Sequence, residues 1–359
     1  MRGFSYPGDI YNATPARVVF GPGSAAGAKA EVARLGATRA LVISTPGRGA
    51  LAESVAANLD ELGVGLLDEA VPQVPIELAV KARAKASAAG ADCLVSVGGG
   101  SATGLAKAIA LDLALPIVAI PTTYAGSEMT GFCGITIDGV KRMHTSLRMV
   151  PSTVVYDAEL SVSLPPSVSA ASAMNGLAHC VDAIYLPHLS PLLAHAAVEG
   201  AKVIATQIPR MLSDPRSLDT RNELLYGAYL GGAALTSGYA LQHDLAHALG
   251  GSLGIEHGLA HALVLPHVAA YNQRFAPQAL GRIAEALDTD NLGGALFDLL
   301  ERSGLPTRLS EVGMDENGIE HAVQVTTSAD SGHGVNPGPV TGAVVRGIVR
   351  RAYAGQRPD

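Results

Sequence analysis

The sequence changes character at Leu164-Pro165-Pro166, and this change constrains the fold more than any other feature of the 359-residue chain. Before it, short β-branched runs alternate with Ala-rich segments whose apolar residues recur at helical spacing. Strands separated by helices of this length are typical of βαβ units and of a mostly parallel sheet. After it, from Ser167 to about Arg302, there is almost no strand pattern. The sequence therefore predicts an α/β domain over residues 1–162 and an all-helical domain over residues 163–359.

The strands of the first domain are expected at its β-branched runs. These are Arg17–Phe20, Ala40–Ser44, Asp92–Val97, Pro116–Ile120 and Thr153–Tyr156. Segments such as Gly49–Leu62 and Ile76–Ala89 are predicted to be helices between them. A chain of this length also exceeds what one hydrophobic core usually organises, which supports two domains.

Composition excludes several classes of protein. The net charge of −7 argues against nucleic-acid binding, because phosphate contacts need a clustered excess of Lys and Arg. The uncharged stretch Leu224–His243 reaches spanning length, but its four glycines and the following Asp244 and His247 indicate a buried helix lining a polar site rather than a membrane segment. The start lacks an apolar signal-peptide run, and the three cysteines form no CxxC pair. A cytoplasmic, soluble protein is expected.

Two polar turns follow neighbouring predicted strands. The first, Gly98-Gly99-Gly100-Ser101, leads into the helical run Ala102–Leu111. A strand that delivers glycines into a helix start brings backbone N–H groups and the positive end of the helix dipole toward an anion such as pyrophosphate. The second turn, Pro121–Glu128, follows the next strand. Open α/β sheets bind nucleotides at such turns, although the GxGxxG pattern of a standard Rossmann domain is absent.

A run of histidines marks the second domain. Five of the eleven histidines fall between positions 243 and 267: His243, His247, His257, His261 and His267. His243 and His247 are four residues apart and share a helix face, and Gly250-Gly251 are expected to end that helix. His257 and His261 repeat the spacing. Such a cluster in an apolar segment is compatible with a transition-metal centre, with proton transfer or with anion binding.

Together these segments resemble the iron-containing alcohol dehydrogenase superfamily. The resemblance runs from Ala13 to about Tyr353 and is carried, in order, by GGGSATGLAKAIA, PTTYAGSEMT, VVYDAELSVSLPP, MNGLAHCVDAIY, HDLAHALGG, IEHGLAHALVLPH and AAYN. Within the superfamily the segments are most similar to the maleylacetate reductases, which carry Gly, here Gly104, where other members have Asp in the glycine turn. The resemblance implies an oxidoreductase that uses NADH or NADPH, acts on a small molecule and forms a homodimer.

The resemblance also implies which residues hold the cofactor. Its pyrophosphate would lie against the glycine turn, and the nucleotide would be flanked by the second turn, so that the implied contacts are Gly98, Gly99, Gly100, Ser101, Thr122, Thr123, Tyr124 and Ser127. Thr45 stands near the position where NAD-specific relatives carry an Asp that accepts the ribose 2′-OH and repels a 2′-phosphate. Thr45 does neither strongly and Arg48 is close in sequence, so the use of both cofactors is expected.

In the metal-dependent members of the superfamily, an Asp and three His hold Fe or Zn. Those positions match Asn175, His179, His243 and His257, with Asn175 and His179 four residues apart on one Ala-rich helix. Asn offers a divalent cation only a neutral carbonyl oxygen, so a metal-free site is predicted. If a metal binds, its ligands would be the three histidines, as in His₃ catalytic sites.

A metal-free site suits one reaction in particular. In maleylacetate a C=C bond is conjugated to a ketone, so hydride attack on the carbon β to the ketone gives an enolate that hydrogen-bond donors can stabilise. We expect His243 and His247 to stabilise or orient the developing charge, with His257 and His179 completing the catalytic set. One imidazole or a relayed water would protonate the α carbon, and the product would be 3-oxoadipate.

The dianionic substrate should need polar and cationic contacts, for which Lys141, Arg148 and Asn175 are the candidates. Lys141 matches a lysine of the family and Arg148 lies seven residues further on; the alternative for both is a solvated loop. Three positions that carry a cation in the family are occupied by other residues here: Asp244, Ser152 and Gly338. These replacements indicate a less anionic substrate or different anion contacts.

Three other functions are compatible with the sequence. A Zn- or Fe-dependent alcohol or aldehyde dehydrogenase would use the three histidines as ligands and would be purified with stoichiometric metal. A lyase of the dehydroquinate synthase type shares the two-domain layout and recycles NAD, so it would consume no NADH. A degenerate nucleotide-binding protein would bind the cofactor and reduce no enone.

Overall fold

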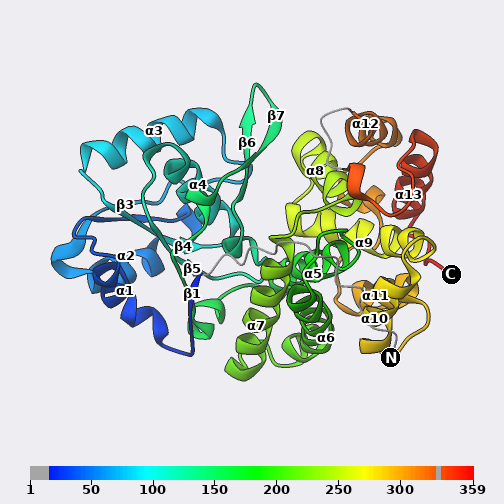
Figure 1. Ribbon diagram of the computed structural model, residues 1–359, viewed down its shortest axis with the longest axis horizontal. Coiled ribbons are helices and arrows are strands. Elements are labelled where there is room, and N and C mark those ends of the chain that lie inside the picture. Colours follow the sequence, from blue (N-terminus) through cyan, green and yellow to red (C-terminus); the bar gives the residue numbers. More distant parts are fainter. Residues whose placement is uncertain (1–15, 329–332) are drawn as a thin grey trace.

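The computed structural model describes residues 16–328 and 333–359, in an α/β part and a helical part (Figure 1). Six strands of the α/β part form one sheet: β1 (Arg17–Phe20), β2 (Ala40–Ile43), β3 (Gly63–Leu67), β4 (Cys93–Gly98), β5 (Ile117–Pro121) and β8 (Thr153–Tyr156). Their order is β1-β8-β5-β4-β2-β3, and every pairing is parallel. The predicted parallel sheet is therefore confirmed.

Helices cover both faces of this sheet, as parallel sheets require. Because successive side chains of a strand point to opposite faces, Val42, Val95 and Val118 join the core on one side, while Leu41 and Leu94 join the core on the other. The first face is covered by α1 (Ala28–Arg34) and α2 (Gly49–Asn58), and the second by α3 (Ile76–Ala88) and α4 (Gly100–Leu113). The result is a three-layer α/β arrangement.

Two features of the α/β part were not predicted. Strand β3 has the sequence GVGLL, in which two glycines interrupt the β-branched pattern. Strands β6 (Phe132–Ile137) and β7 (Val140–Thr145) form an antiparallel hairpin, whose turn residues Asp138 and Gly139 both have positive φ. Asp-Gly is a typical hairpin turn for this reason. The hairpin stands between the two parts of the molecule beside α8 (Leu241–Leu253), and thereby extends the α/β part toward the helices (Figure 1).

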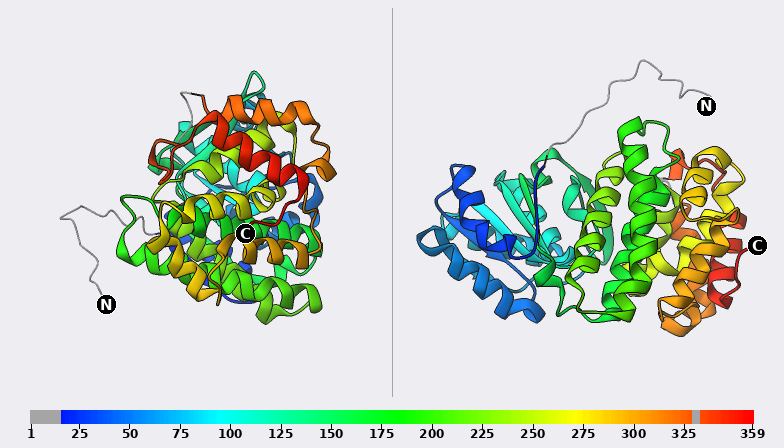
Figure 2. Two further views of the ribbon diagram at one scale, coloured as in Figure 1. Left: turned by 90° about the vertical axis from the view of Figure 1, so that its right-hand side faces the viewer. Right: turned by 90° about the horizontal axis from the view of Figure 1, so that it is seen from below.

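From Pro166 onward, the described residues form helices and connecting segments without strands, as predicted. The helices besides α8 are α5 (Pro166–Ala183), α6 (Pro191–Ser213), α7 (Leu218–Leu235), α9 (His257–Gln273), α10 (Pro277–Ala286), α11 (Leu292–Arg302), α12 (Glu316–Thr326) and α13 (Gly342–Ala354). The predicted domain boundary at 162/163 falls between the 3₁₀ turn Ala158–Ser161 and α5. One hydrophobic core runs from the α3/α4 face of the sheet into the helices, so the two parts share apolar packing. Figure 2 shows the α/β part and the helical part side by side.

The uncharged stretch Leu224–His243 is not one helix, and that prediction was wrong. Helix α7 ends at Leu235 and α8 begins at Leu241. The glycines of the stretch serve close packing, since a Cβ at Gly231 would lie 2.6 Å from the Gly176 carbonyl oxygen of α5. Among the residues that the structure describes, no helix is long and apolar enough to cross a membrane.

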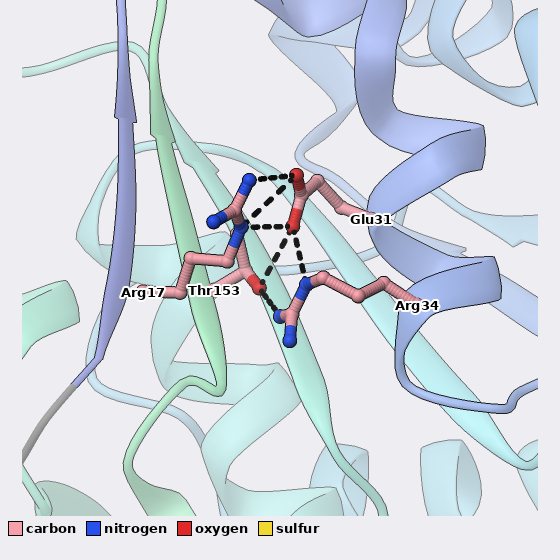
Figure 3. Close-up of polar contacts among 4 residues, drawn as sticks. All are labelled: Arg17, Glu31, Arg34 and Thr153. Atoms are coloured by element: carbon pink, nitrogen blue, oxygen red, sulfur yellow. Dashed lines mark hydrogen bonds and ion pairs between the residues drawn. The ribbon is translucent and has the colours of Figure 1, made fainter.

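An ion-pair network joins the edge of the sheet to the first helix (Figure 3). The carboxylate of Glu31 on α1 accepts from Arg17 Nε of β1 at 2.9 Å and from Arg34 Nε at 3.0 Å. Arg34 also donates through Nη2 to Thr153 Oγ1 of β8 at 2.7 Å. The half-exposed Arg17 contributes little on its own, but the network holds the edge strand against its neighbour and α1.

Candidate active site

The first half of the site is the edge of the sheet at the carboxyl ends of β2, β4 and β5, called here the nucleotide edge. Gly98, at the end of β4, has φ +146, and α4 begins two residues later at Gly100. A Cβ at Gly99 would lie 2.8 Å from Thr123 Cγ2, so only glycine allows this approach. The Thr122 N–H donates to the Gly98 carbonyl at 3.0 Å and joins the two polar turns predicted from the sequence.

The N-terminus of α4 lies open at this edge. A Cβ at Gly100 would meet no protein atom within 4 Å, although Gly99 beside it is tightly packed. Unpaired N–H groups and the helix dipole make such a terminus suited to a phosphate. Ser101 follows in the first turn of α4, and Thr45 lies two residues after the end of β2. The structure thus places the glycine turn, Ser101 and Thr45 at neighbouring strand ends.

Lys107 of α4 is a buried cation that the sequence analysis did not identify. Its ammonium donates to the Ser127 carbonyl at 2.6 Å, to Thr130 Oγ1 at 3.1 Å and to the Phe132 carbonyl at 3.0 Å. Burial lowers the pKa of Lys107 to about 8. Lys107 therefore fixes the second turn and the start of the hairpin relative to the glycine turn. Its only signal in the sequence was a lysine inside an otherwise apolar helix.

The side chain of Tyr124, which was predicted to flank the nucleotide, packs toward the junction of the two parts. Its ring is fully buried, and its hydroxyl contacts Arg221 Nη1 at 2.7 Å and Ser161 Oγ at 3.1 Å. Arg221 of α7 is itself fully buried and donates to the carbonyls of Ser161 and Leu164 in the segment that joins the two parts. Tyr124 and Arg221 thus tie the second turn to the junction between the parts of the molecule.

The second half of the site is an imidazole cluster contributed by three helices: His179 of α5, His243 and His247 of α8, and His257 and His261 of α9. The ring centres of His243 and His261 lie 4.7 Å apart, as do those of His257 and His261. His179 stacks on His243 at 5.1 Å, and His247 stacks on His257 at 5.8 Å. The four histidines predicted to be catalytic are therefore brought together around His261, for which no role was assigned.

Local capping explains how the helices present these rings. Glu256 caps α9 by accepting from the N–H groups of Gly258 and Leu259 at 3.0 and 2.8 Å, so His257 is the first helical residue. Helix α8 does not end at Gly250-Gly251 as predicted. It continues to Leu253, because Gly254, with φ +71, supplies the left-handed conformation of the C-cap.

Most histidines of the imidazole cluster are uncharged. Burial lowers the pKa values of His179, His247, His257 and His261 well below their usual range, so these imidazoles are uncharged at pH 7. Several polar atoms of the cluster have no hydrogen-bond partner among the described residues: Asn175 Oδ1, His179 Nδ1, His243 Nε2, His257 Nδ1 and His261 Nε2. Buried polar atoms normally find partners, so these atoms are available to a bound ligand.

Asp182 is the second residue that sequence reasoning missed. It is fully buried on α5, three residues after His179, and its Oδ2 lies 2.6 Å from His243 Nδ1. Tyr239 completes the surroundings, with its ring centre 5.4 Å from that of His243 and 5.8 Å from that of His247. A charged residue within MNGLAHCVDAIY was the only available signal for Asp182.

The two predicted substrate cations occupy very different places. Lys141 of β7 packs against α8: a Cβ added to Gly251 would lie 3.4 Å from the Cβ of Lys141. The charge of Lys141 lowers the pKa values of His247 and His257, in addition to the effect of burial. Arg148 is exposed and donates to the Leu111 carbonyl at the far end of α4 from the glycine turn. The structure thus brings Lys141, and not Arg148, to the imidazole cluster.

Comparison with known proteins agrees with this architecture. The model of the iron-containing alcohol dehydrogenase family matches residues 15–158, and that of the family's C-terminal domain matches residues 169–353. The maleylacetate reductase of Burkholderia cepacia is 44% identical over 351 residues, which cover 98% of this chain and 99% of the relative. The chain belongs to the iron-containing alcohol dehydrogenase family.

Solved structures of family members superpose closely on this one. A putative alcohol dehydrogenase from Ralstonia eutropha JMP134 has a TM-score of 0.94 at 46% identity and covers 98% of this chain and 99% of its own. The maleylacetate reductase of Rhizobium sp. strain MTP-10005 has a TM-score of 0.91 at 39% identity over the whole of both chains. The protein is therefore an oxidoreductase of this family, similar to maleylacetate reductases, with a nicotinamide cofactor and a small-molecule substrate.

The name of the family implies iron, but the donor set at these positions does not fit a metal. Asn175 stands where an anionic oxygen would be needed, and its Oδ1 is buried without a partner among the described residues. In the described part of the chain, no three His, Cys, Asp or Glu side chains are arranged to hold one ion.

Proposed function

We propose that this protein reduces the conjugated C=C bond of maleylacetate, or of a similar ene-ketone acid, to give 3-oxoadipate without a metal. The proposal is supported by the position of Lys141 beside His247 and His257, because one cation next to neutral N–H donors suits a carboxylate attached to a reacting enone. It is further supported by the full-length similarity to maleylacetate reductases.

A nicotinamide bound at the nucleotide edge would supply a hydride to the carbon β to the ketone. The electron pair of the C=C bond then moves onto the α carbon and the ketone oxygen as an enolate. Neutral imidazoles of the cluster stabilise this oxygen by hydrogen bonding. One proton, delivered by an imidazole or a relayed water, reaches the α carbon. The sum is maleylacetate, NAD(P)H and a proton giving 3-oxoadipate and NAD(P)⁺.

The choice of cofactor depends on the end of β2. Thr45 carries no charge that would repel a 2′-phosphate, so we propose that both NADH and NADPH are used. Arg48 donates to Ser163 Oγ at 2.6 Å and is already engaged at the junction of the two parts. We therefore expect no strong preference for NADPH over NADH. A homodimer in the cytoplasm completes the proposal, and light scattering would test the dimer.

The decisive experiment follows nicotinamide absorbance with chelator-treated protein, NADH and freshly prepared maleylacetate. Prompt oxidation of NADH with one equivalent of 3-oxoadipate formed supports the proposal. No oxidation, together with turnover of simple aldehydes only after Zn or Fe is added, would identify a metal-dependent alcohol dehydrogenase instead. NADH binding without oxidation of any substrate would indicate a binding protein.

A further inference from the structure

A continuous chain of hydrogen bonds leads from His243 away from the imidazole cluster and into the helical part. Asp182 Oδ2 contacts His243 Nδ1 at 2.6 Å and accepts from the Ala240 N–H at 2.8 Å, while Asp182 Oδ1 contacts the Tyr185 hydroxyl. Asn272 Nδ2 lies 3.1 Å from the Tyr185 hydroxyl oxygen. The side chains of Asn272 and Asn336 are bonded to each other through both amides, at 2.9 and 3.0 Å.

The direction of each bond in this chain, except the contact between Asp182 and His243, follows from the number of donors. Asn336 Nδ2 donates to the Asn272 Oδ1 and to the Gly338 carbonyl, which fixes both amides. Asn272 Nδ2 must then donate to the Tyr185 oxygen, which leaves the Tyr185 hydrogen for Asp182 Oδ1. The Ala240 N–H can only donate. Asp182 therefore accepts from Tyr185 and from Ala240, and only the direction of its contact with His243 is left open.

The charge of a carboxylate determines the tautomer of His243. A carboxyl group is ordinarily ionised at neutral pH and then has no hydrogen to give, so the contact at 2.6 Å is made by a hydrogen on His243 Nδ1. The other ring nitrogen, Nε2, then faces away from Asp182, among the other imidazoles, and it has no partner in the described part of the chain. Of the ion pairs between described residues, this is the only one that involves a histidine of the cluster.

We propose that Asp182 is a positioning residue for His243: it holds the hydrogen on Nδ1 and turns Nε2 toward the reacting substrate. The proposal rests on the proposed ene-ketone reduction and specifies which imidazole supplies the proton in it. The hydrogen on His243 Nδ1 is bonded to Asp182, so His243 can give the enolate only a second hydrogen, carried on Nε2. An imidazole ring with hydrogens on both nitrogens is a cation, and the Asp182 carboxylate offsets its charge. The proton passes from Nε2 to the α carbon, and the ring returns to its neutral Nδ1–H form.

Asp182→Asn tests this role because its geometry is constrained. The Ala240 N–H can only donate, so the amide oxygen must face Ala240 and His243, and the amide nitrogen must face Tyr185. The variant keeps an acceptor for His243 Nδ1–H and removes the charge. We expect kcat for maleylacetate to fall about 10- to 100-fold, with the KM for NADH unchanged, because outer partners of reactive imidazoles have effects of this size.

A double-mutant cycle with His243→Ala separates this role from a structural one. If Asp182 acts through His243, then Asp182→Asn lowers kcat in the native background but changes it by less than about 2-fold in the His243→Ala background. An equal loss in both backgrounds, or a kcat within about 2-fold of wild type in Asp182→Asn alone, would overturn the proposal.

A measurement on the unmodified protein covers the case in which the variant does not fold. Long-range ¹H–¹⁵N spectra of ¹⁵N-histidine-labelled protein without substrate, with His243 assigned by comparison with His243→Ala, report the tautomer directly. A protonated Nδ1 supports the proposal, and a protonated Nε2 with a bare Nδ1 contradicts it. Because this measurement needs no turnover, it tests the tautomer even if the protein does not reduce maleylacetate. Whether the protein reduces maleylacetate is decided separately, by the activity of the wild type.

Discussion

The nucleotide edge and the imidazole cluster are built from different parts of the chain. At the nucleotide edge the binding groups are backbone N–H groups, and the sequence places glycine where a side chain would not fit, as at Gly99 beside Thr123. At the cluster the binding groups are side chains from three helices, and their orientation depends on further buried residues such as Asp182. A backbone site fails when an atom is added to it, and a side-chain site fails when a partner is removed or charged.

The largest effect is expected where the nucleotide edge rests on the helices. A Cβ at Gly232 of α7 would overlap the Gly126 carbonyl oxygen in the second turn, and neither backbone can move without disturbing α5 or the sheet. Gly232→Ala should lower the free energy of unfolding by about 3 kcal/mol or more, the upper end for overpacking. Urea denaturation followed by circular dichroism measures it.

Gly281→Ala in α10 is the matched control, because no atom lies within 4 Å of the added Cβ. This variant should be about 0.5–1 kcal/mol more stable than wild type, as alanine favours a helix over glycine. Equal losses of stability in the two variants would mean that the contact between Gly126 and Gly232 is not what constrains the helix.

Acid should act on the helical part, where the buried histidines lie. Burial lowers the pKa of His267 to about 4, and both of its ring nitrogens lack partners among the described residues. A histidine with a depressed pKa contributes stability that is complete above the unfolded value near 6.5 and is lost as the pH falls toward about 4. His267 alone accounts for a loss of about 3 kcal/mol across this window.

Denaturation curves between pH 7 and pH 4 measure this loss, with His267→Leu as the comparison. The variant should lose less stability than wild type on acidification, and the remaining slope should come from the four depressed imidazoles of the cluster. Parallel curves for the two proteins would show that the pKa of His267 is the same in the folded and the unfolded state, contrary to its burial.

The difference between the two regions also explains what could be predicted from the sequence. The glycine turn is contiguous, so strand, turn and helix were visible together, and five of the six strands of the sheet were located from β-branched runs. Strand β3 was missed because glycines occupy two of its five positions. The split between α7 and α8 was missed because the stretch is uniformly small and uncharged.

The cluster was predictable only in part. Pairs four residues apart identified helix faces, and the family resemblance selected four of the histidines. Asp182, in contrast, accepts from Ala240 and contacts His243, which are 58 and 61 residues away, and Arg221 reaches Tyr124 across 97 residues. Buried charges are stabilised by partners distant in sequence, so a local pattern does not reveal which Asp, Lys or Arg is buried.

Removing the cation of Lys141, whose charge acts on His247 and His257, should weaken the binding of substrate. Lys141→Met should raise the KM for maleylacetate about 10- to 100-fold, as expected for a charge-assisted bond, with a smaller change in kcat and none in the KM for NADH. Since the pKa of Lys141 is lowered to about 8, the KM of the wild type should also rise above that pH as the lysine loses its proton. Steady-state kinetics from pH 7 to pH 9 measures both effects.

Arg148→Met is the control for this experiment, because Arg148 is exposed and bonded to the far end of α4. Its KM for maleylacetate should stay within about 2-fold of wild type, the small effect usual for exposed charges. A KM raised by Arg148→Met but not by Lys141→Met would reverse the placement of the substrate carboxylate.

The smallest effect should come from an atom added where the protein itself has room. A Cβ at Gly100 meets nothing within 4 Å, so Gly100→Ala should fold with at least the stability of wild type, given that alanine favours the first turn of α4 over glycine. If the cofactor pyrophosphate lies against this turn, the same methyl group should raise the Kd for NADH about 10-fold, and fluorescence titration measures it. The Kd of Asp182→Asn should not change. Unaltered NADH binding in Gly100→Ala would place the pyrophosphate elsewhere on the sheet edge, and the open space at this helix terminus would then have no part in cofactor binding.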